Sequence, residues 1–198
     1  MTPATTSGAN GAAAKPLSDH NGGSPLRIAL RSDGVAVITF DLPGESVNTI
    51  RADFVEHFRR AFDEIDGHPD IRAAVLVSGK PGSFIVGADV NMINALVSYD
   101  DTVAMIKRGH AALARVRKAT KPVVAAIDGP ALGGGFEVAL ACQGRVCSDN
   151  PKTVMGLPEV KLGVLPALSG LQMFAEIVGL QVALDHGLTG KNLRPKKA

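Results

Sequence analysis

The sequence lacks any apolar run long enough to cross a bilayer, and its 198 residues carry a net charge of only +2. A membrane-spanning helix needs about 20 consecutive, mostly apolar residues, and a nucleic-acid-binding surface needs an excess of basic residues, so we expect neither. Positive charge gathers only at Arg194, Lys196 and Lys197, which we interpret as a solvated tail. With 45% hydrophobic and 20% charged residues, the chain has the balance of an ordinary globular domain.

Cysteine and histidine are too few and too scattered to predict a metal or redox centre. The two cysteines, Cys142 and Cys147, show neither the C-x-x-C redox spacing nor a zinc pattern. We interpret them as small apolar core residues in a reducing compartment. No two of the five histidines form an H-x-x-x-H pair, and we interpret each as a lone surface residue or one with its hydrogen bonds satisfied: His20, His57, His68, His110 and His186.

Fingerprints of nucleotide binding and of export are also missing. No G-x-G-x-x-G follows a predicted strand, and no G-x-x-x-x-G-K-[ST] occurs, so neither a dinucleotide site nor a P-loop is expected. Residues 1–25 lack a periodic apolar pattern and are predicted to be a disordered tail. They also lack the apolar region of a secretory signal, and the first arginine is Arg27, which argues against a mitochondrial transit peptide. A cytoplasmic location follows by default.

From residue 26 onwards, predicted strands alternate with predicted helices. The strands are expected at 26–30, 35–41, 72–78, 121–129 and 144–149, with short extended pieces over 153–166. The helices are expected at about 51–66, 90–96, 101–119, 135–142, 168–178 and 181–187. The central strands are almost entirely apolar, as when both faces of a sheet are buried. The pattern therefore predicts an α/β domain with mainly parallel strands.

The segment PALGGGFEVAL, residues 130–140, places three glycines directly before a helix. Glycine lets the backbone approach a ligand closely, and the first N–H groups of a helix are unpaired and carry partial positive charge. Such a site suits an oxygen that becomes anionic in a transition state. A second loop, FIVGADV at 84–90, can supply another N–H group, and two such donors would form an oxyanion hole.

Two glutamates accompany these loops. Glu137 lies in the first turn after the glycines, and Glu159 follows 22 positions later (159 − 137). Two carboxylates beside an oxyanion hole suit proton transfer next to a carbonyl, with or without addition of water. We expect the helix N-terminus to keep Glu137 ionised. We expect the apolar neighbours of Glu159 to raise its pKa.

Each of these features also has a purely structural explanation. The glycines allow tight packing of a strand against a helix, and Glu137 complements the helix dipole. Glu159 is then an ordinary loop carboxylate, and the GAD segment is a common turn. Taken one at a time, the structural explanations are the stronger; taken together and in this order, the features favour a catalytic site.

Four segments resemble the enoyl-CoA hydratase/isomerase (crotonase) family in order and spacing: VITFDLPGESVNTI, SFIVGADVNMI, AAIDGPALGGGFEVALAC and GLPEVKLGVLP. Within that family, FDLPGESVNTI and the closing LTGKNLRPKKA are most similar to the N-terminal domain of the multifunctional fatty-acid β-oxidation α subunit. The resemblance implies a spiral of ββα units that form two roughly perpendicular sheets with helices around them. It also implies an enoyl-CoA hydratase that adds water to 2,3-unsaturated acyl-CoA thioesters in fatty-acid β-oxidation, with isomerisation of the double bond as a further activity.

The resemblance carries over roles for individual residues. Ala88 and Gly134 would bind the thioester oxygen through their backbone N–H groups. Glu137 and Glu159 would hold the added water and transfer protons. The loop after Ala88 would line the bound coenzyme A chain: Asp89, Val90 and Asn91.

No metal or redox cofactor is implied, because coenzyme A is part of the substrate. The implied partners are an acyl-CoA substrate and further copies of the chain in a trimer-based homo-oligomer. If the chain belongs to a longer subunit, the implied partner is a thiolase.

The chain departs from the family pattern in two places. The family's PGAGGTQRL-type turn is replaced by PALSGLQMFAE, and Met173 stands where arginine is usual. The added side chains of Ala167, Leu168 and Ser169 are expected either to narrow the acyl pocket or to disturb the loop that carries Glu159. The sequence also stops at Ala198, before the helices that cover the family's site, so we interpret residues 26–198 as a C-terminally truncated hydratase domain, a fragment of a multifunctional enzyme. The alternative is a non-catalytic domain that binds acyl-CoA or forms a subunit interface.

Overall fold

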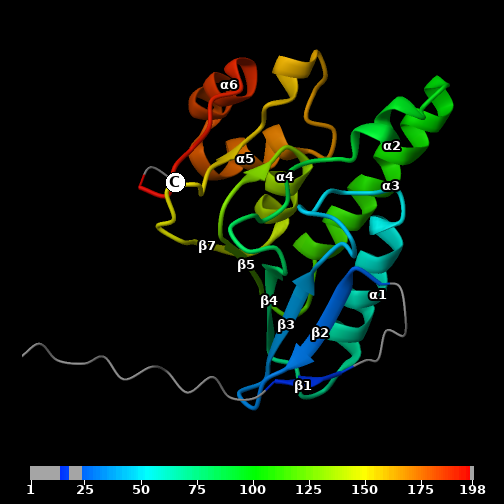
Figure 1. Ribbon diagram of the computed structural model, residues 1–198, viewed down its shortest axis with the longest axis vertical. Helices are drawn as coiled ribbons and strands as arrows, with labels where there is room; N and C mark the ends of the chain where they lie inside the picture. Colours follow the sequence, from blue (N-terminus) through cyan, green and yellow to red (C-terminus); the bar gives the residue numbers. More distant parts are fainter. Residues whose placement is uncertain (1–13, 18–23, 197–198) are drawn as a thin grey trace, which may run out of the picture.

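In the computed structural model, which describes residues 14–17 and 24–196, strands and helices alternate along the chain as predicted (Figure 1). The strands are β1 (Lys15–Pro16), β2 (Leu26–Leu30), β3 (Val35–Phe40), β4 (Ala73–Ser78), β5 (Val123–Ile127), β6 (Ala131–Leu132), β7 (Gly144–Cys147) and β8 (Met155–Gly156). The helices are α1 (Phe54–Gly67), α2 (Val90–Asn94), α3 (Tyr99–Arg117), α4 (Gly134–Ala141), the 3-10 helix η1 (Glu159–Leu162), α5 (Gly170–Val178) and α6 (Leu180–Thr189).

Two short strands, β1 and β6, are absent from the sequence prediction. β1 lies inside the predicted disordered tail 1–25, where Lys15 pairs with Leu30 and Pro16 with Ala29. The rest of that tail up to residue 23, namely 1–13 and 18–23, lies outside the described residues. A strand of two residues has no alternation to detect, because the side-chain period of a strand is itself two residues.

The large sheet is mixed, with its parallel strands extending to one edge and its antiparallel strands at the other. Its strand order is β1-β2-β3-β4-β5-β7. β3, β4, β5 and β7 run parallel, whereas β1 and β2 join antiparallel at one edge. Burial alternates along β4 and β5, so one face is fully buried and the other only partly. The prediction that both faces are buried is therefore correct for only one face of β4 and β5.

A second, smaller layer lies beside the ends of the parallel strands. β6 pairs in parallel with β8, and isolated bridges join Ile50 to Ala88 and Ile85 to Ala131. Each parallel strand is thus followed by a short extended piece and then a helix: β3 by Ile50 and α1, β4 by 85–88 and α2, and β5 by β6 and α4. This repeated unit, a strand, a short bridge and a helix, is the ββα spiral implied by the resemblance.

Helix α1 covers the buried face of the sheet with the apolar stripe that its sequence predicts. Phe54 and Phe58 stack with ring centroids 4.6 Å apart, and Phe54 also contacts Phe40 of β3 at 5.4 Å. Next to it lies α3, which at 19 residues is the longest helix described. None of the helices in the described ranges combines the length and the apolar character that crossing a membrane requires.

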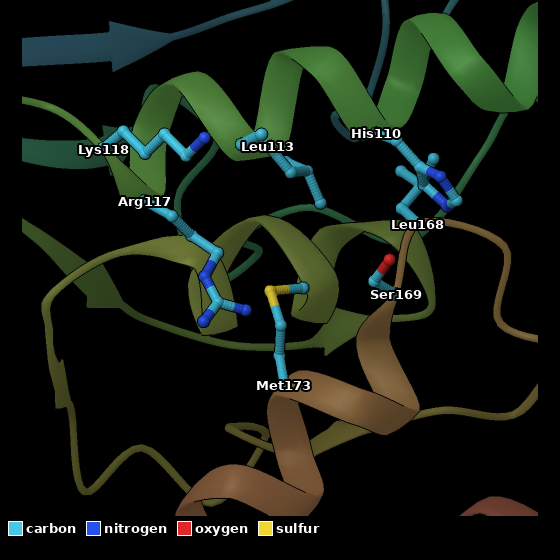
Figure 2. Close-up of a pocket in the computed structure, with 8 residues that line it drawn as sticks. His110, Leu113, Arg117, Lys118, Leu168, Ser169 and Met173 are labelled. Carbon is cyan, nitrogen blue, oxygen red and sulfur yellow. The ribbon is translucent and has the colours of Figure 1, made fainter.

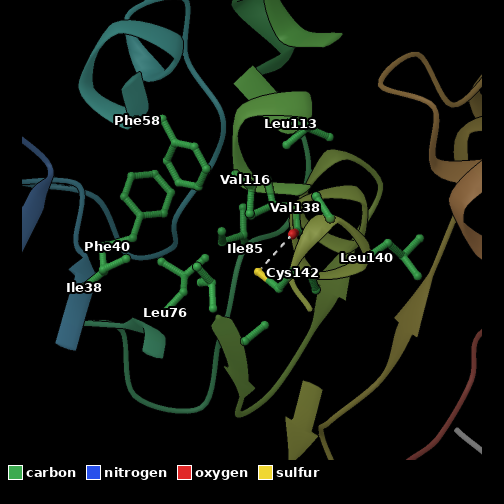
Figure 3. Packing of buried hydrophobic residues seen from close by; sticks show 14 of the residues in the cluster. Ile38, Phe40, Phe58, Leu76, Ile85, Leu113, Val116, Val138, Leu140 and Cys142 are labelled. Atoms are coloured by element: carbon green, nitrogen blue, oxygen red, sulfur yellow. Dashed lines mark hydrogen bonds between the residues drawn. The ribbon is translucent and has the colours of Figure 1, made fainter. Parts of the chain in front are cut away.

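The core extends from this face to helix α4, whose eight residues are all buried (Figure 3). Cys142 belongs to it: its Sγ contacts the Val138 carbonyl at 3.4 Å, and burial raises the pKa of the thiol to about 12. Cys147 was predicted to be a core residue as well, but it is exposed. It lies at the end of β7, which is the edge strand of the sheet formed by the described residues.

Candidate active site

The backbone N–H group of Ala88 points away from Ile50, the residue with which Ala88 forms a parallel bridge. The two bonds of this bridge are made by its neighbours: the Ile50 N–H donates to the Gly87 carbonyl at 2.8 Å, and the Asp89 N–H donates to the Ile50 carbonyl at 2.9 Å. In a parallel pairing the residue between two such bonds directs its own N–H to the opposite side. Within the described residues, the Ala88 N–H donates to no protein group.

The three glycines of the PALGGGFEVAL segment have three different roles. Gly133 has φ 52°, a conformation that favours glycine, and caps helix α4. Gly135 packs against backbone, since a Cβ there would lie 2.0 Å from the Ile85 carbonyl oxygen. Gly134 is the first residue of α4, so its N–H has no intrahelical acceptor. The packing explanation thus holds for Gly135, while Gly134 keeps a free donor.

The two loops meet beside these donors. A Cβ on Gly133 would lie 3.7 Å from Gly87 Cα, which brings the residues that follow each of them, Gly134 and Ala88, into one place. A Cβ on Gly134 would lie 2.9 Å from Ile50 Cδ1. The residues that carry the two N–H groups therefore lie close together at the start of α4.

Glu137 is one turn into α4 and only 2% exposed. Its Oε1 accepts hydrogen bonds from the Leu168 N–H at 2.8 Å and the Gly170 N–H at 2.7 Å. Its Oε2 lies on the side of Gly134, 3.9 Å from where a Cβ on that glycine would be. One oxygen is thus anchored to the turn before α5, while the other faces the free donors.

Glu159 reaches the same place from the start of η1. Its Oε1 lies 2.8 Å from the position of a Cβ on Gly133. Its Oε2 is buried and makes no hydrogen bond within the described residues. A buried carboxylate oxygen without a partner is costly, so this atom is the one most in need of a ligand at the site.

The two carboxyl groups share an environment that favours their protonated forms. Burial raises the pKa of Glu137 to about 7, opposed by its two backbone donors and aided by the charge of Glu159. Burial also raises the pKa of Glu159, as the sequence predicts. The prediction that the helix N-terminus keeps Glu137 ionised is wrong, because removing the carboxylate from water outweighs the favourable interaction with the helix end.

This burial makes stability depend on pH. Between pH 4.5, the ordinary value, and about pH 7, the folded chain keeps a proton on Glu137 that the unfolded chain releases. The free energy of unfolding is therefore expected to fall as pH rises through this window, by at most about 3 kcal/mol from this group. Glu137→Gln should remove that part of the slope, and urea unfolding at about pH 5 and about pH 8 measures it. Equal slopes in the variant and the wild type would contradict the burial of this carboxyl.

The loop predicted to line the coenzyme A chain, residues 89–91, follows Ala88, and its side chains lie mostly at the surface. Asp89 caps helix α2, with its Oδ1 accepting from the Asn91 N–H at 2.7 Å and the Met92 N–H at 3.4 Å. Its carboxylate is thus occupied by the helix. Val90 is 63% exposed, and Asn91 is exposed as well, so both are open to a ligand that passes over α2.

The turn before α5 contains contributors that sequence reasoning missed. Leu168 and Gly170 supply the N–H groups that anchor Glu137. A Cβ on Gly170 would lie 2.5 Å from Glu137 Cγ, so the close approach requires glycine. Gly170 is the glycine that the altered turn shares with the PGAGGTQRL-type pattern, and that shared glycine is the signal that could have identified it.

A cavity of about 510 Å³ opens between α3 and α5 beside this turn (Figure 2). Leu168 and His110 lie at one end, Leu113 and Met173 face each other across the middle, and Arg117 and Lys118 lie at the other end. The Leu168 side chain also reaches towards Gly134, with its Cδ1 3.8 Å from the position of a Cβ there. Leu168 therefore lies between the carboxyl site and the cavity.

Within residues 14–17 and 24–196, no three His, Cys, Asp or Glu side chains converge as metal ligands would.

Most of this chain matches a known protein family and curated relatives. The family described as enoyl-CoA hydratase/isomerase matches residues 31–198. The fatty acid oxidation complex subunit alpha of Idiomarina loihiensis is 49% identical over 169 residues, which are 85% of this chain and 24% of that protein. The subunit of the same name from Shewanella oneidensis is 46% identical over 176 residues, 89% of this chain and 25% of that protein. The chain thus spans about a quarter of the length of these curated relatives.

Solved structures show the same fold. An enoyl-CoA hydratase from Thermoplasma volcanium superposes with a TM-score of 0.81 at 26% identity, covering 89% of this chain and 68% of that one. DspI of Pseudomonas aeruginosa superposes with a TM-score of 0.81 at 29% identity, covering 91% and 71%. By sequence and by structure, the chain belongs to the enoyl-CoA hydratase/isomerase family.

Proposed function

We propose that the chain adds water across the double bond of 2,3-unsaturated acyl-CoA thioesters. The observation that carries this proposal is the meeting of the buried Glu137 and the half-buried Glu159 with the free N–H groups of Ala88 and Gly134. Two backbone donors suit an oxygen on which negative charge develops. Two carboxyl groups suit a reaction that takes one proton from water and gives one to carbon.

The proposed reaction divides the work between these groups. The N–H groups of Ala88 and Gly134 bind the thioester oxygen and stabilise the charge that it gains as the oxygen of water bonds to the β carbon. Glu137, in its ionised form, takes the proton from that water. Glu159, in its protonated form, delivers its proton to the α carbon, and the pair then returns to its starting state by proton exchange. The shared environment supports a pair that holds one proton, because one proton between two close carboxyl groups is favoured over two charges, so that one group can act as the base and the other as the acid.

Hydration of a short enoyl-CoA by the purified chain tests the proposal. The absorbance of the conjugated thioester is expected to fall with time, and 3-hydroxyacyl-CoA is expected to accumulate. A folded chain that leaves this absorbance unchanged at high protein concentration would refute the hydratase assignment.

The names of the relatives, fatty acid oxidation complex subunits alpha, support a proposed role of this reaction in fatty acid oxidation. Isomerisation is a further proposed activity, because moving a double bond along the acyl chain needs the oxyanion donors and a proton-transferring acid but no added water. Glu159, whose Oε2 has no partner, is the acid that we assign to it.

We further propose that the cavity between α3 and α5 receives the acyl chain, with Leu168 limiting its length. Leu168→Ala is expected to raise kcat/KM for long enoyl-CoA relative to short, by about tenfold, because removing side-chain atoms from an apolar pocket changes binding by about 1–3 kcal/mol. Leu165→Ala is the matched control, since Leu165 is in the same loop and 82% exposed. An unchanged chain-length profile in Leu168→Ala would show that the acyl chain takes another route.

A subunit-interface or acyl-CoA-binding domain without turnover is the second candidate function. Four leucines of η1, the following loop and α6 are 66–82% exposed: Leu162, Leu165, Leu180 and Leu188. Apolar surface of this kind marks contacts with other proteins, and a homo-oligomer or a thiolase partner would cover it. The hydration assay separates the two candidates, since an interface domain binds without consuming substrate.

A further inference from the structure

A histidine on helix α3, His110, contacts the turn whose N–H groups anchor Glu137. His110 Nε2 lies 2.7 Å from the carbonyl oxygen of Ala167. A carbonyl oxygen can only accept a hydrogen bond, so Nε2 must carry the hydrogen. Protonation of the ring leaves Nε2 a donor, so the contact persists in both charge states of His110.

The bonded carbonyl and the anchoring N–H belong to the same peptide unit. The Ala167 carbonyl accepts from His110, and the N–H of the same Ala167–Leu168 peptide donates to Glu137 Oε1 at 2.8 Å. A peptide unit is planar, so fixing its oxygen also fixes the direction of its N–H. Successive hydrogen bonds through one peptide also polarise each other.

Gly109, the residue before His110, contacts the same turn through the side chain of Leu168. A Cβ on Gly109 would lie 2.3 Å from Leu168 Cδ2, so the Leu168 side chain occupies the space that the missing Cβ leaves on α3. Ser169, the next residue of the turn, has φ 70°, an unfavourable conformation for a residue other than glycine. A strained turn persists only where its surroundings hold it, and Gly109 and His110 supply two such contacts.

We propose that His110 is a positioning residue for Glu137 and acts through the Ala167–Leu168 peptide. Its consequence for catalysis rests on the proposed hydratase function, whereas its consequence for the Glu137 carboxyl does not. Without the His110 donor, the peptide is free to tilt and its N–H moves away from Oε1.

The groups around Glu137 predict the direction of the effect. A hydrogen bond to the ionised form lowers the pKa of a carboxyl, so loosening the Leu168 N–H should raise the pKa of Glu137. Glu159, on η1, is the charged group that acts on Glu137 directly, and it stays in place in the variants. The residues that α5 buries carry no charge: Gly170, Met173 and Phe174. On α3, His110 faces Glu137 only across the peptide.

Three variants test the proposal. His110→Leu removes the donor, and His110→Gln restores one, because its side-chain amide can reach a carbonyl. His186→Leu is the matched control: His186 Nδ1 also lies 3.0 Å from a backbone carbonyl oxygen, that of Lys191, which follows α6 and is not part of the turn that anchors Glu137. If His110→Leu fails to fold, His110→Phe, which keeps a ring but has no donor, takes its place.

The first measurement is the pKa of Glu137, by NMR titration of chain labelled with ¹³C at the glutamate carboxyl carbons, with Glu137→Gln to assign the signal. His110→Leu should raise this pKa by up to about one unit, and His110→Gln and His186→Leu should leave it near the wild-type value. An unchanged pKa in a folded His110→Leu, or an equal rise in His110→Gln, would overturn the proposal. This result stands whether or not the chain is a hydratase.

The second measurement is the pH dependence of hydration. His110→Leu is expected to lower kcat by about two- to tenfold near neutral pH, the range of one ordinary hydrogen bond, with KM little changed. In the plot of hydration rate against pH, the part of the curve that rises as Glu137 ionises should move to higher pH in His110→Leu. In His110→Gln it should lie near the wild-type position. A fall in kcat with no movement of this part of the curve would show a general disturbance of the turn and refute positioning through the peptide.

Discussion

Replacing either carboxyl group of the site with an amide should lower the hydration rate by about 10²–10⁴, the usual contribution of a general acid or base. Glu137→Gln keeps an oxygen for the N–H groups of Leu168 and Gly170 but cannot take a proton from water. Glu159→Gln keeps the size of the side chain but has no proton to deliver to the α carbon. Both variants should fold, because glutamine fills the same volume and needs no desolvation of a charge.

The two variants should differ in isomerisation. Glu137→Gln is expected to keep measurable isomerase activity, since no water has to be activated, whereas Glu159→Gln is expected to lose both activities. Hydratase and isomerase rates should be measured side by side, with circular dichroism to check folding. Glu176→Gln serves as the control, because Glu176 lies on the surface of α5 and pairs there with Arg117 at 2.8 Å.

Three outcomes would contradict parts of the assignment. Near wild-type isomerisation by Glu159→Gln would mean that another group protonates the α carbon. Full hydration by both variants would move the site away from Glu137 and Glu159. A comparable loss in Glu176→Gln would show that the effect comes from the surface charge and not from the buried pair.

Most of the fold could be predicted because its elements carry strong periodic patterns. The stripe of Phe54, Phe58 and Phe62 predicts α1, and the apolar run 123–127 predicts β5; both are present in the structure. The elements that were missed have too few residues to show a period, as with β1 and β6. Cys147 was placed wrongly because composition alone does not reveal that β7 lies at the end of the sheet.

For the candidate site, residue types could be predicted but their surroundings could not. The glycines before α4 and the two glutamates stand out in the sequence, and the structure brings Glu137 and Glu159 together beside Gly133 and Gly134. The pKa of Glu137 is raised, whereas the sequence predicts that the ionised form is favoured. The helix end can be read from the sequence, but the depth of burial cannot. The hydrogen bond from His110 joins residues 57 positions apart, and no local pattern reports such a contact.

Gly134→Val should abolish most turnover while leaving the chain folded. A Cβ at this position meets the movable end of the Ile50 side chain at 2.9 Å and is otherwise 3.8 Å from Leu168 and 3.9 Å from Glu137. Valine therefore fills the space between the free N–H and the carboxyl groups, where the thioester oxygen is proposed to bind. Loss of one oxyanion donor costs about 10²–10³ in kcat, and blocking access for the oxygen should cost at least as much.

Two other glycines distinguish a blocked site from a damaged fold. Gly67→Val is the neutral control, because no heavy atom lies within 4 Å of a Cβ placed there. Gly135→Ala should instead lower the unfolding temperature strongly, since its Cβ would lie 2.0 Å from the Ile85 carbonyl oxygen and the backbone cannot yield as a side chain can. Hydration rates and thermal unfolding of all three variants, with Gly134→Ala added in case the valine is not tolerated, give the comparison. If folded Gly134→Val hydrates enoyl-CoA at the wild-type rate, the Gly134 N–H is not an oxyanion donor, and the thioester must bind elsewhere.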